Sequence, residues 1–183
     1  MRAVRGNVPH AARTERRALP YIYRNLFADL LVHASLVNIQ GSHTIAAAPA
    51  RVFEALTDPA ILQRAIPGCE KMEKTGDDTY NAHLKIGVAS IKGSYVGKVR
   101  LSDKVPPHKF TLHLEGKGGP GFVKGSAAME LKEEAKSTRL SYTADVQVGG
   151  LIAAVGSRMI EATAKKLAEE FFKKFSEIVT AKP

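Results

Sequence analysis

The sequence contains little of what disulfides, multi-cysteine metal sites and base-stacking surfaces require. Cys69 is the only cysteine among 183 residues, so neither an intrachain disulfide nor a multi-cysteine metal site can form, and a reducing compartment is the simpler expectation. Tryptophan is absent and no basic stripe carries interleaved aromatic residues, which argues against a nucleic-acid partner. No stretch approaches the apolar length that crosses a bilayer, so neither a membrane span nor a secretory signal is predicted.

Of the formal net charge of +9, residues 1–34 carry +4. Residues 1–34 contain six arginines against one glutamate and one aspartate, and the remaining excess is spread over a sequence that mixes both signs. Charged side chains on ordinary solvent-exposed surfaces explain this remaining positive charge better than a nucleic-acid-binding surface does. Three interpretations of the basic extension at residues 1–34 compete: a disordered tail, a docking helix, or a start assigned too early, with translation beginning near Leu36 or Val37. We treat residues 35–183 as one domain.

Period-two alternation of apolar and polar residues predicts strands over most of this domain. After the first strand, Pro49 suits the first turn of a short helix, while Asp58-Pro59 ends that helix and caps a second one. Successive strands joined by turns predict an antiparallel sheet with one wet and one dry face, and residues 116–121 are expected to form a glycine-rich turn. The seven expected strands are residues 36–45, 69–74, 80–88, 91–101, 110–115, 122–131 and 138–148.

At Gly149 and Gly150 the alternation gives way to a period of 3.6. This pattern predicts one helix over residues 151–180, about 45 Å long. Because only this helix is long enough to cover the dry face, the sheet should curl around it, giving an α+β fold. The apolar stripe of the helix is expected to contain Ile152, Val155, Met159, Ile160, Thr163, Leu167, Phe171, Phe175 and Ile178.

The predicted inner face of the sheet carries no reactive ionisable group. Its residues are aliphatic or aromatic, and Tyr80, Tyr95 and Tyr142 are the only ones with a hydroxyl. We find no inward carboxylate pair, no histidine with a serine or cysteine partner at a recognisable spacing, and no phosphate loop. The sequence therefore predicts no catalytic residue, no metal and no cofactor.

Five segments form an ordered set: Asp58-Pro59 with Leu62, Ile66-Pro-Gly-Cys-Glu70, Ile91-Lys-Gly-Ser-Tyr-Val-Gly-Lys-Val99, Gly119-Pro-Gly-Phe-Val-Lys-Gly125 and Val146-Gln-Val-Gly-Gly-Leu-Ile-Ala-Ala-Val-Gly-Ser-Arg-Met-Ile160. This set, within a match that runs from about residue 36 to 175, resembles the CoxG family of carbon monoxide dehydrogenase subunits, which belongs to the START-like (SRPBCC, Bet v 1-like) helix-grip superfamily. The resemblance implies a curved antiparallel sheet that grips a C-terminal helix around a hydrophobic tunnel. That fold agrees with the one reached from periodicity.

The resemblance also implies an accessory role beside molybdenum hydroxylases such as aerobic carbon monoxide dehydrogenase. The role would be assembly, membrane recruitment, or carriage of a lipophilic electron acceptor such as a quinone. Family members often carry a C-terminal extension that ends in a membrane anchor, and this sequence reaches Pro183 without one. We therefore expect a cytoplasmic protein with at most peripheral contact at the inner face of the membrane.

Our leading hypothesis is a non-enzymatic carrier of a hydrophobic small molecule, a quinone or a lipid. Inward glycines at positions 93, 97 and 125 either allow the sheet to bend or leave volume for that ligand. Two alternatives stay open: a surface-acting assembly factor with an incidental cavity, and a cyclase-like enzyme, which rests on fold analogy alone. Core packing also explains any single member of the predicted ligand-binding set, which is Tyr80, Leu84, Ile86, Tyr95, Gly97, Phe110, Leu112, Phe122, Met129, Tyr142, Ile152, Val155 and Met159.

Overall fold

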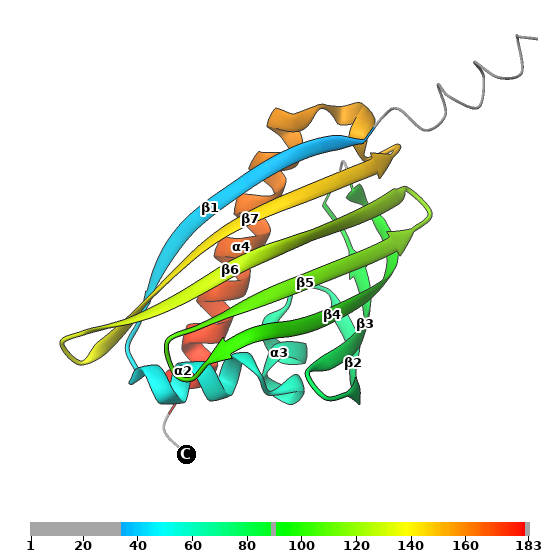
Figure 1. Ribbon diagram of the computed structural model, residues 1–183. Helices are drawn as coiled ribbons and strands as arrows, with labels where there is room; N and C mark the ends of the chain where they lie inside the picture. Colours follow the sequence, from blue (N-terminus) through cyan, green and yellow to red (C-terminus); the bar gives the residue numbers. More distant parts are fainter. Residues whose placement is uncertain (1–33, 89–90, 182–183) are drawn as a thin grey trace, which may run out of the picture. The chain divides into compact units, whose positions relative to one another are not determined.

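A single antiparallel sheet curves around a long helix, α4 (Figure 1). The computed structural model describes residues 34–88 and 91–181, and in this part of the chain the strand order is β1-β7-β6-β5-β4-β3-β2. The first and last strands of the sequence are therefore neighbours, and the predicted α+β helix-grip fold is confirmed. The strands are β1 (Ser35–Ile45), β2 (Cys69–Gly76), β3 (Thr79–Ile86), β4 (Gly93–Val105), β5 (Lys109–Gly118), β6 (Gly121–Glu134) and β7 (Ser137–Gly150). The interpretations of residues 1–34 concern a segment that, except for Ala34, lies outside the described residues.

The two short helices predicted after the first strand are confirmed as α2 (Pro49–Leu56) and α3 (Pro59–Ala65). Each begins with a proline, and the side chain of Asp58 accepts a hydrogen bond from the backbone N–H of Ala60 at 2.8 Å, as expected for an N-cap. Both helices lie near the C-terminal half of α4, at one end of the sheet (Figure 1).

The long helix α4 spans Ser157–Thr180, so the predicted start at residue 151 is wrong. A short 3₁₀ turn (Ala153–Val155) precedes it, and Gly156 between them has a φ of 87°, which lies outside the helical region. The 24 residues of α4 give a length of about 36 Å. The sequence signal for this break was Gly156 itself, which the continuous apolar period concealed.

The predicted glycine-rich turn at residues 116–121 is also wrong in extent. Gly116 lies inside β5, where it pairs with Gly97 of β4 on one side and Val123 of β6 on the other. Only Gly119 and Pro120 separate β5 from β6. Because glycine is rare in strand interiors, the glycine run predicts a turn, whereas the position of Gly116 continues the alternation of Phe110, Leu112 and Leu114.

Aromatic side chains fill the part of the interior between β1, β7 and the C-terminal half of α4. Phe175 is fully buried, and the imidazole of His43 stacks on the Phe172 ring with 4.1 Å between ring centroids. Burial lowers the pKa of His43, an effect that the negative charge of Glu169 partly opposes. His43 is thus a packing residue on the inner face of the sheet.

Candidate ligand-binding cavity

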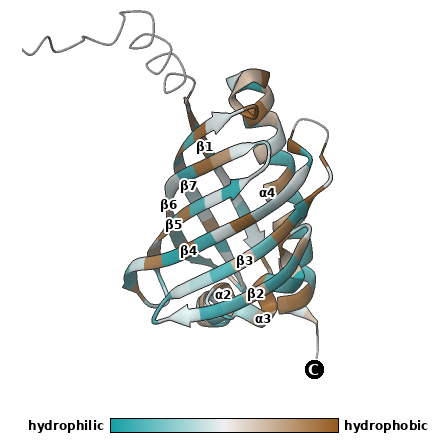
Figure 2. Ribbon diagram, turned by 90° about the vertical axis from the view of Figure 1, so that its right-hand side faces the viewer, coloured by the Kyte–Doolittle hydropathy of each residue, from teal (hydrophilic) through white to brown (hydrophobic). Residues whose placement is uncertain are grey.

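A cavity of about 350 Å³ lies between the inner face of the sheet and α4. This volume is at the lower end of the range for small-molecule sites, roughly 300–1,000 Å³. Figure 2 shows hydrophobic and hydrophilic residues alternating along the strands. This alternation makes one face of the sheet apolar, and that face packs against α4. The wall is formed mainly by aliphatic residues: Ile39, Leu84, Ile86, Val99, Leu114, Val123, Val146 and Val148 from the sheet, and Ile152, Ile160, Ala164 and Leu167 from the segment after it.

Two glycines leave open space in this cavity. Gly97 and Gly116 face each other on adjacent strands and both line the cavity. A Cβ atom added at Gly116 would meet no heavy atom within 4 Å, and one at Gly97 would come no closer than 3.7 Å, to Leu84 Cδ1. Neither glycine is therefore required by tight packing, and their shared effect is to leave the interior open at this level.

None of the residues that the structure describes turns a charged side chain into the cavity. Lys98 and Glu115 border it, but both are exposed and alternate with inward residues, so their charged groups lie on the outer face. There, a hydrogen bond and the positive charge of Lys124, whose Nζ is 3.1 Å from Glu115 Oε1, lower the pKa of the Glu115 carboxyl. The cavity thus contains no acid–base pair within the described residues.

Among the described wall residues, two carry a hydroxyl group, Tyr95 and Thr163. The Tyr95 hydroxyl donates a hydrogen bond to the backbone carbonyl of Ile91 at 2.7 Å. Burial raises the pKa of Tyr95, so this hydroxyl stays neutral at physiological pH. Thr163 lies on α4 and is 8% exposed.

The thirteen residues predicted to bind a ligand fall into three groups in the structure. Five of them line the cavity: Leu84, Ile86, Tyr95, Gly97 and Ile152. A second group packs in the interior away from the cavity wall: Tyr80, Phe110, Leu112, Met129 and Tyr142. The third group is exposed, at 39% for Phe122, 38% for Val155 and 51% for Met159.

Members of the second group pack beside the two short helices or beside α4. Phe110 meets Phe53 of α2 edge to face, with 5.6 Å between ring centroids, while Tyr142 stacks on Phe172 at 5.7 Å. Alternation along a strand predicts which face of the sheet a residue occupies, but not whether the space next to that residue is open or filled by other side chains. Next to Phe110 and Tyr142, side chains from α2 and α4 fill the space.

The inward positions predicted for Val155 and Met159 are wrong. Val155 precedes the break at Gly156 and lies outside α4, so the period assumed for one continuous helix does not apply to it. Met159 lies inside α4 beside the buried Ile160, at the edge of the apolar stripe, and both Val155 and Met159 reach the surface. Phe122 lies on the outer face because its neighbour Val123 points into the cavity.

The structure also identifies cavity residues that the sequence did not. Gly116 falls within the run predicted as a turn, and Ile39, Val123 and Val148 lie in predicted strands but outside the predicted site. For Gly116, Val123 and Val148 the available signal was their position in the alternation, which they share with inward residues that were recognised on the same strands, such as Leu112, Met129 and Tyr142. No inward residue was predicted for the strand that contains Ile39.

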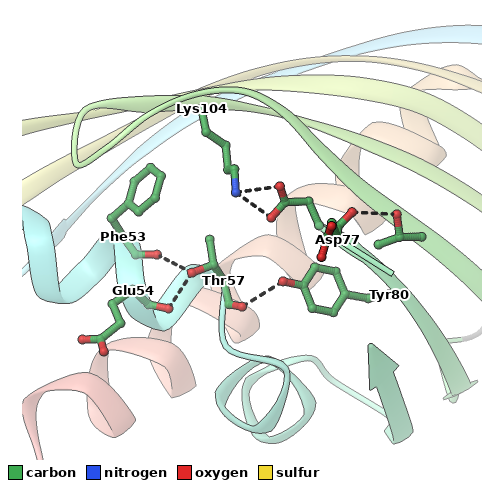
Figure 3. A network of polar contacts seen from close by, with 8 residues as sticks. Phe53, Glu54, Thr57, Asp77, Tyr80 and Lys104 are labelled. Carbon is green, nitrogen blue, oxygen red and sulfur yellow. Dashed lines mark hydrogen bonds and ion pairs between the residues drawn. The ribbon is translucent and has the colours of Figure 1, made fainter. Parts of the chain in front are cut away.

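Tyr80 has a structural role at the end of the sheet near α2. Figure 3 shows its hydroxyl directed at the backbone carbonyl of Thr57, to which it donates a hydrogen bond of 2.9 Å. The Thr57 hydroxyl in turn donates to the carbonyls of Phe53 and Glu54 in α2. Tyr80 therefore connects β3 to the end of α2.

Replacing Tyr80 by phenylalanine should lower stability without changing ligand affinity. The loss of one buried hydrogen bond is expected to reduce the free energy of unfolding by about 1 kcal/mol, measured by urea titration followed by circular dichroism. Tyr95→Phe removes a comparable hydrogen bond within the cavity wall, so its ligand affinity is compared with that of Tyr80→Phe. A weakened ligand complex in Tyr80→Phe, with Tyr95→Phe unaffected, would contradict this assignment.

One serine–histidine–aspartate contact occurs on the outer face. Ser102 donates a hydrogen bond to Asp103 at 2.7 Å, and its oxygen lies 2.8 Å from Nε2 of His113. The serine thus lies between the other two, whereas a catalytic triad places the histidine between the serine and the carboxylate. Across residues 34–88 and 91–181, no group of three metal-ligating side chains is found and no helix is long and apolar enough to span a membrane.

The sequence comparison decides the family. The family described as CoxG, a subunit of carbon monoxide dehydrogenase, matches residues 41–180. The chain belongs to the CoxG family. The resemblance found in the sequence is therefore confirmed, and no curated protein matches the chain.

Solved structures support the fold of this CoxG protein. A conserved protein from Geobacillus kaustophilus is 38% identical with a TM-score of 0.76, covering 78% of this chain and 95% of its own. A START superfamily protein from Mycobacterium smegmatis is 15% identical with a TM-score of 0.60, covering 78% and 96%. The Zhui aromatase/cyclase from Streptomyces sp. R1128 is 17% identical with a TM-score of 0.59, covering 79% and 94%. The last two show the shared START-like fold, which together with the family indicates a ligand-binding helix-grip protein.

Proposed function

We propose that this CoxG protein is a non-enzymatic carrier that binds a quinone or a lipid-like molecule in the cavity between α4 and the sheet. The main support for this proposal is a cavity of about 350 Å³ with a mainly aliphatic wall, into which none of the described residues turns a charged side chain. Removing apolar ligand surface from water contributes about 25 cal/mol per Å², or about 5 kcal/mol for each 200 Å² buried. An apolar ligand of one or two rings therefore gains substantial affinity without any ionic contact.

The absence of an inward acid or base among the described residues supports carriage over catalysis. The cyclase among the structural neighbours shares only the fold, at 17% identity. We further propose that the carrier serves a molybdenum hydroxylase such as carbon monoxide dehydrogenase, as the name of the family suggests.

Native mass spectrometry of gently purified protein tests the carrier function. We expect a co-purified hydrophobic molecule, or a one-to-one complex after addition of 2-methyl-1,4-naphthoquinone. A protein that purifies without a bound molecule, and that binds neither added naphthoquinone nor added phospholipid, would overturn the proposal.

We also propose that the ligand enters from a membrane at the N-terminal end of α4. Leu151 is 74% exposed and Met159 51% exposed, while Ile152 between them lines the cavity. Arg158 is exposed in the same segment, which suits contact with anionic headgroups. This peripheral contact requires no spanning helix.

Replacing both Leu151 and Met159 by glutamate should reduce co-sedimentation with phosphatidylcholine–phosphatidylglycerol vesicles by on the order of tenfold, because two apolar side chains no longer enter the lipid interface. Val105→Glu is the matched control, since Val105 is 45% exposed at the C-terminal end of β4, on the side of the molecule near α2 (Figure 1). Equal vesicle binding by the double variant and this control would contradict the proposed membrane contact.

A further inference from the structure

Thr163 is the exception in an otherwise aliphatic helix surface. It lies in the second turn of α4, between Ile160 and Leu167, and all three line the cavity. Only 8% of the residue is exposed, so its hydroxyl is held within the protein interior.

The Thr163 hydroxyl has no hydrogen-bond partner within the described residues. Helical threonines commonly donate to the carbonyl three or four residues earlier, and both Thr57, at the end of α2, and Thr180, in α4, do so, at 2.9 Å and 2.7 Å. Thr163 makes no such bond. No side-chain oxygen in this part of the chain is both fully buried and unpartnered, so the Thr163 oxygen retains accessible surface, which lies at the cavity.

The second hydroxyl of the wall is already committed, because that of Tyr95 donates to the Ile91 carbonyl. A lone hydroxyl facing an apolar cavity loses its water partners when a hydrophobic ligand enters, unless the ligand replaces them. A ligand with an oxygen acceptor opposite Thr163 is therefore favoured over a pure hydrocarbon of the same shape.

We propose that Thr163 is the polar anchor of the cavity and selects ligands that carry a carbonyl oxygen on an apolar body. Its hydroxyl donates to that oxygen, while the aliphatic wall binds the rest of the molecule. This inference rests on the proposed carrier function and specifies its ligand class.

Two probes of nearly equal shape test the anchor by equilibrium dialysis: 2-methyl-1,4-naphthoquinone and 2-methylnaphthalene, which lacks both carbonyls. Thr163→Val keeps the shape of the side chain and removes the hydroxyl. We expect this variant to bind the quinone roughly three- to tenfold more weakly, the equivalent of one hydrogen bond, and to bind the hydrocarbon as the wild type does or more tightly. Thr163→Ser restores the hydroxyl and should restore the preference for the quinone.

Equal quinone affinity in the wild type and Thr163→Val would overturn the anchor and leave the carrier function standing. So would a parallel loss of both probes, which would indicate altered packing. If the wild-type protein binds neither probe, the carrier function and the anchor fail together. Thermal unfolding of each variant verifies that the dialysed protein is folded.

Discussion

Gly116→Leu is expected to weaken ligand binding strongly while leaving the protein folded. The new side chain would extend from β5 into the cavity, where an added Cβ meets no heavy atom within 4 Å. Filling the space removes the surface on which an apolar ligand gains affinity, so binding of 2-methyl-1,4-naphthoquinone should weaken by on the order of a hundredfold. Because leucine suits a strand interior better than glycine, the thermal midpoint should stay constant or rise.

Gly119→Leu is the matched control for this variant. Gly119 lies in the turn between β5 and β6, is exposed, and also leaves an added Cβ without a neighbour within 4 Å. It should bind the naphthoquinone as the wild type does. Unchanged affinity in Gly116→Leu, with a normal thermal midpoint, would show that the ligand occupies another site.

The same variant distinguishes a carrier from a surface-acting assembly factor. A carrier with a filled cavity retains its outer surface and loses its cargo, so a molybdenum hydroxylase partner should still be captured but no longer exchange quinone with it. If Gly116→Leu supports the partner enzyme fully, assembly through the surface becomes the better explanation and the cavity is incidental.

Phe175→Ala is expected to cause the largest loss of stability in the protein. Phe175 is fully buried and its ring stacks on that of Phe171, with 5.6 Å between centroids. Truncating a buried phenylalanine costs about 3–5 kcal/mol, through lost burial and the cavity left behind. This is a large share of the roughly 5–15 kcal/mol that stabilises a typical domain, so the urea midpoint should fall sharply.

Phe122→Ala provides the comparison, because Phe122 is 39% exposed on the outer face of β6. We expect it to cost less than about 1 kcal/mol. Equal losses in the two variants would mean that α4 does not depend on Phe175 for its packing against the sheet.

Most of the fold could be predicted because its local signals agree with its packing. Pro49 and Asp58 mark the two short helices, and strict alternation in β4 places Tyr95 and Gly97 on the inner face, as observed. The same reasoning failed where glycine conformation overrides periodicity. Gly156 interrupts the apolar stripe with a positive φ, and Gly116 continues a strand that its composition concealed.

The candidate site was harder to predict than the fold. The face of the sheet that a residue occupies follows from its neighbours in the sequence, whereas a cavity depends on how side chains from distant elements pack. Tyr80 and Gly97 lie on the same face of neighbouring strands, yet only Gly97 lines the cavity. The hydroxyl of Tyr80 instead donates a hydrogen bond to the backbone carbonyl of Thr57. Thr163 was recognised as part of the apolar stripe, but its lack of a helical hydrogen bond is visible only in the structure.

A crystal structure with bound 2-methyl-1,4-naphthoquinone would locate the ligand. The proposed carrier function predicts the ring between the paired glycines Gly97 and Gly116 and the N-terminal half of α4, with one carbonyl oxygen within about 3 Å of the Thr163 hydroxyl. A ring bound on the outer surface, or an interior in which side chains close the cavity, would contradict it.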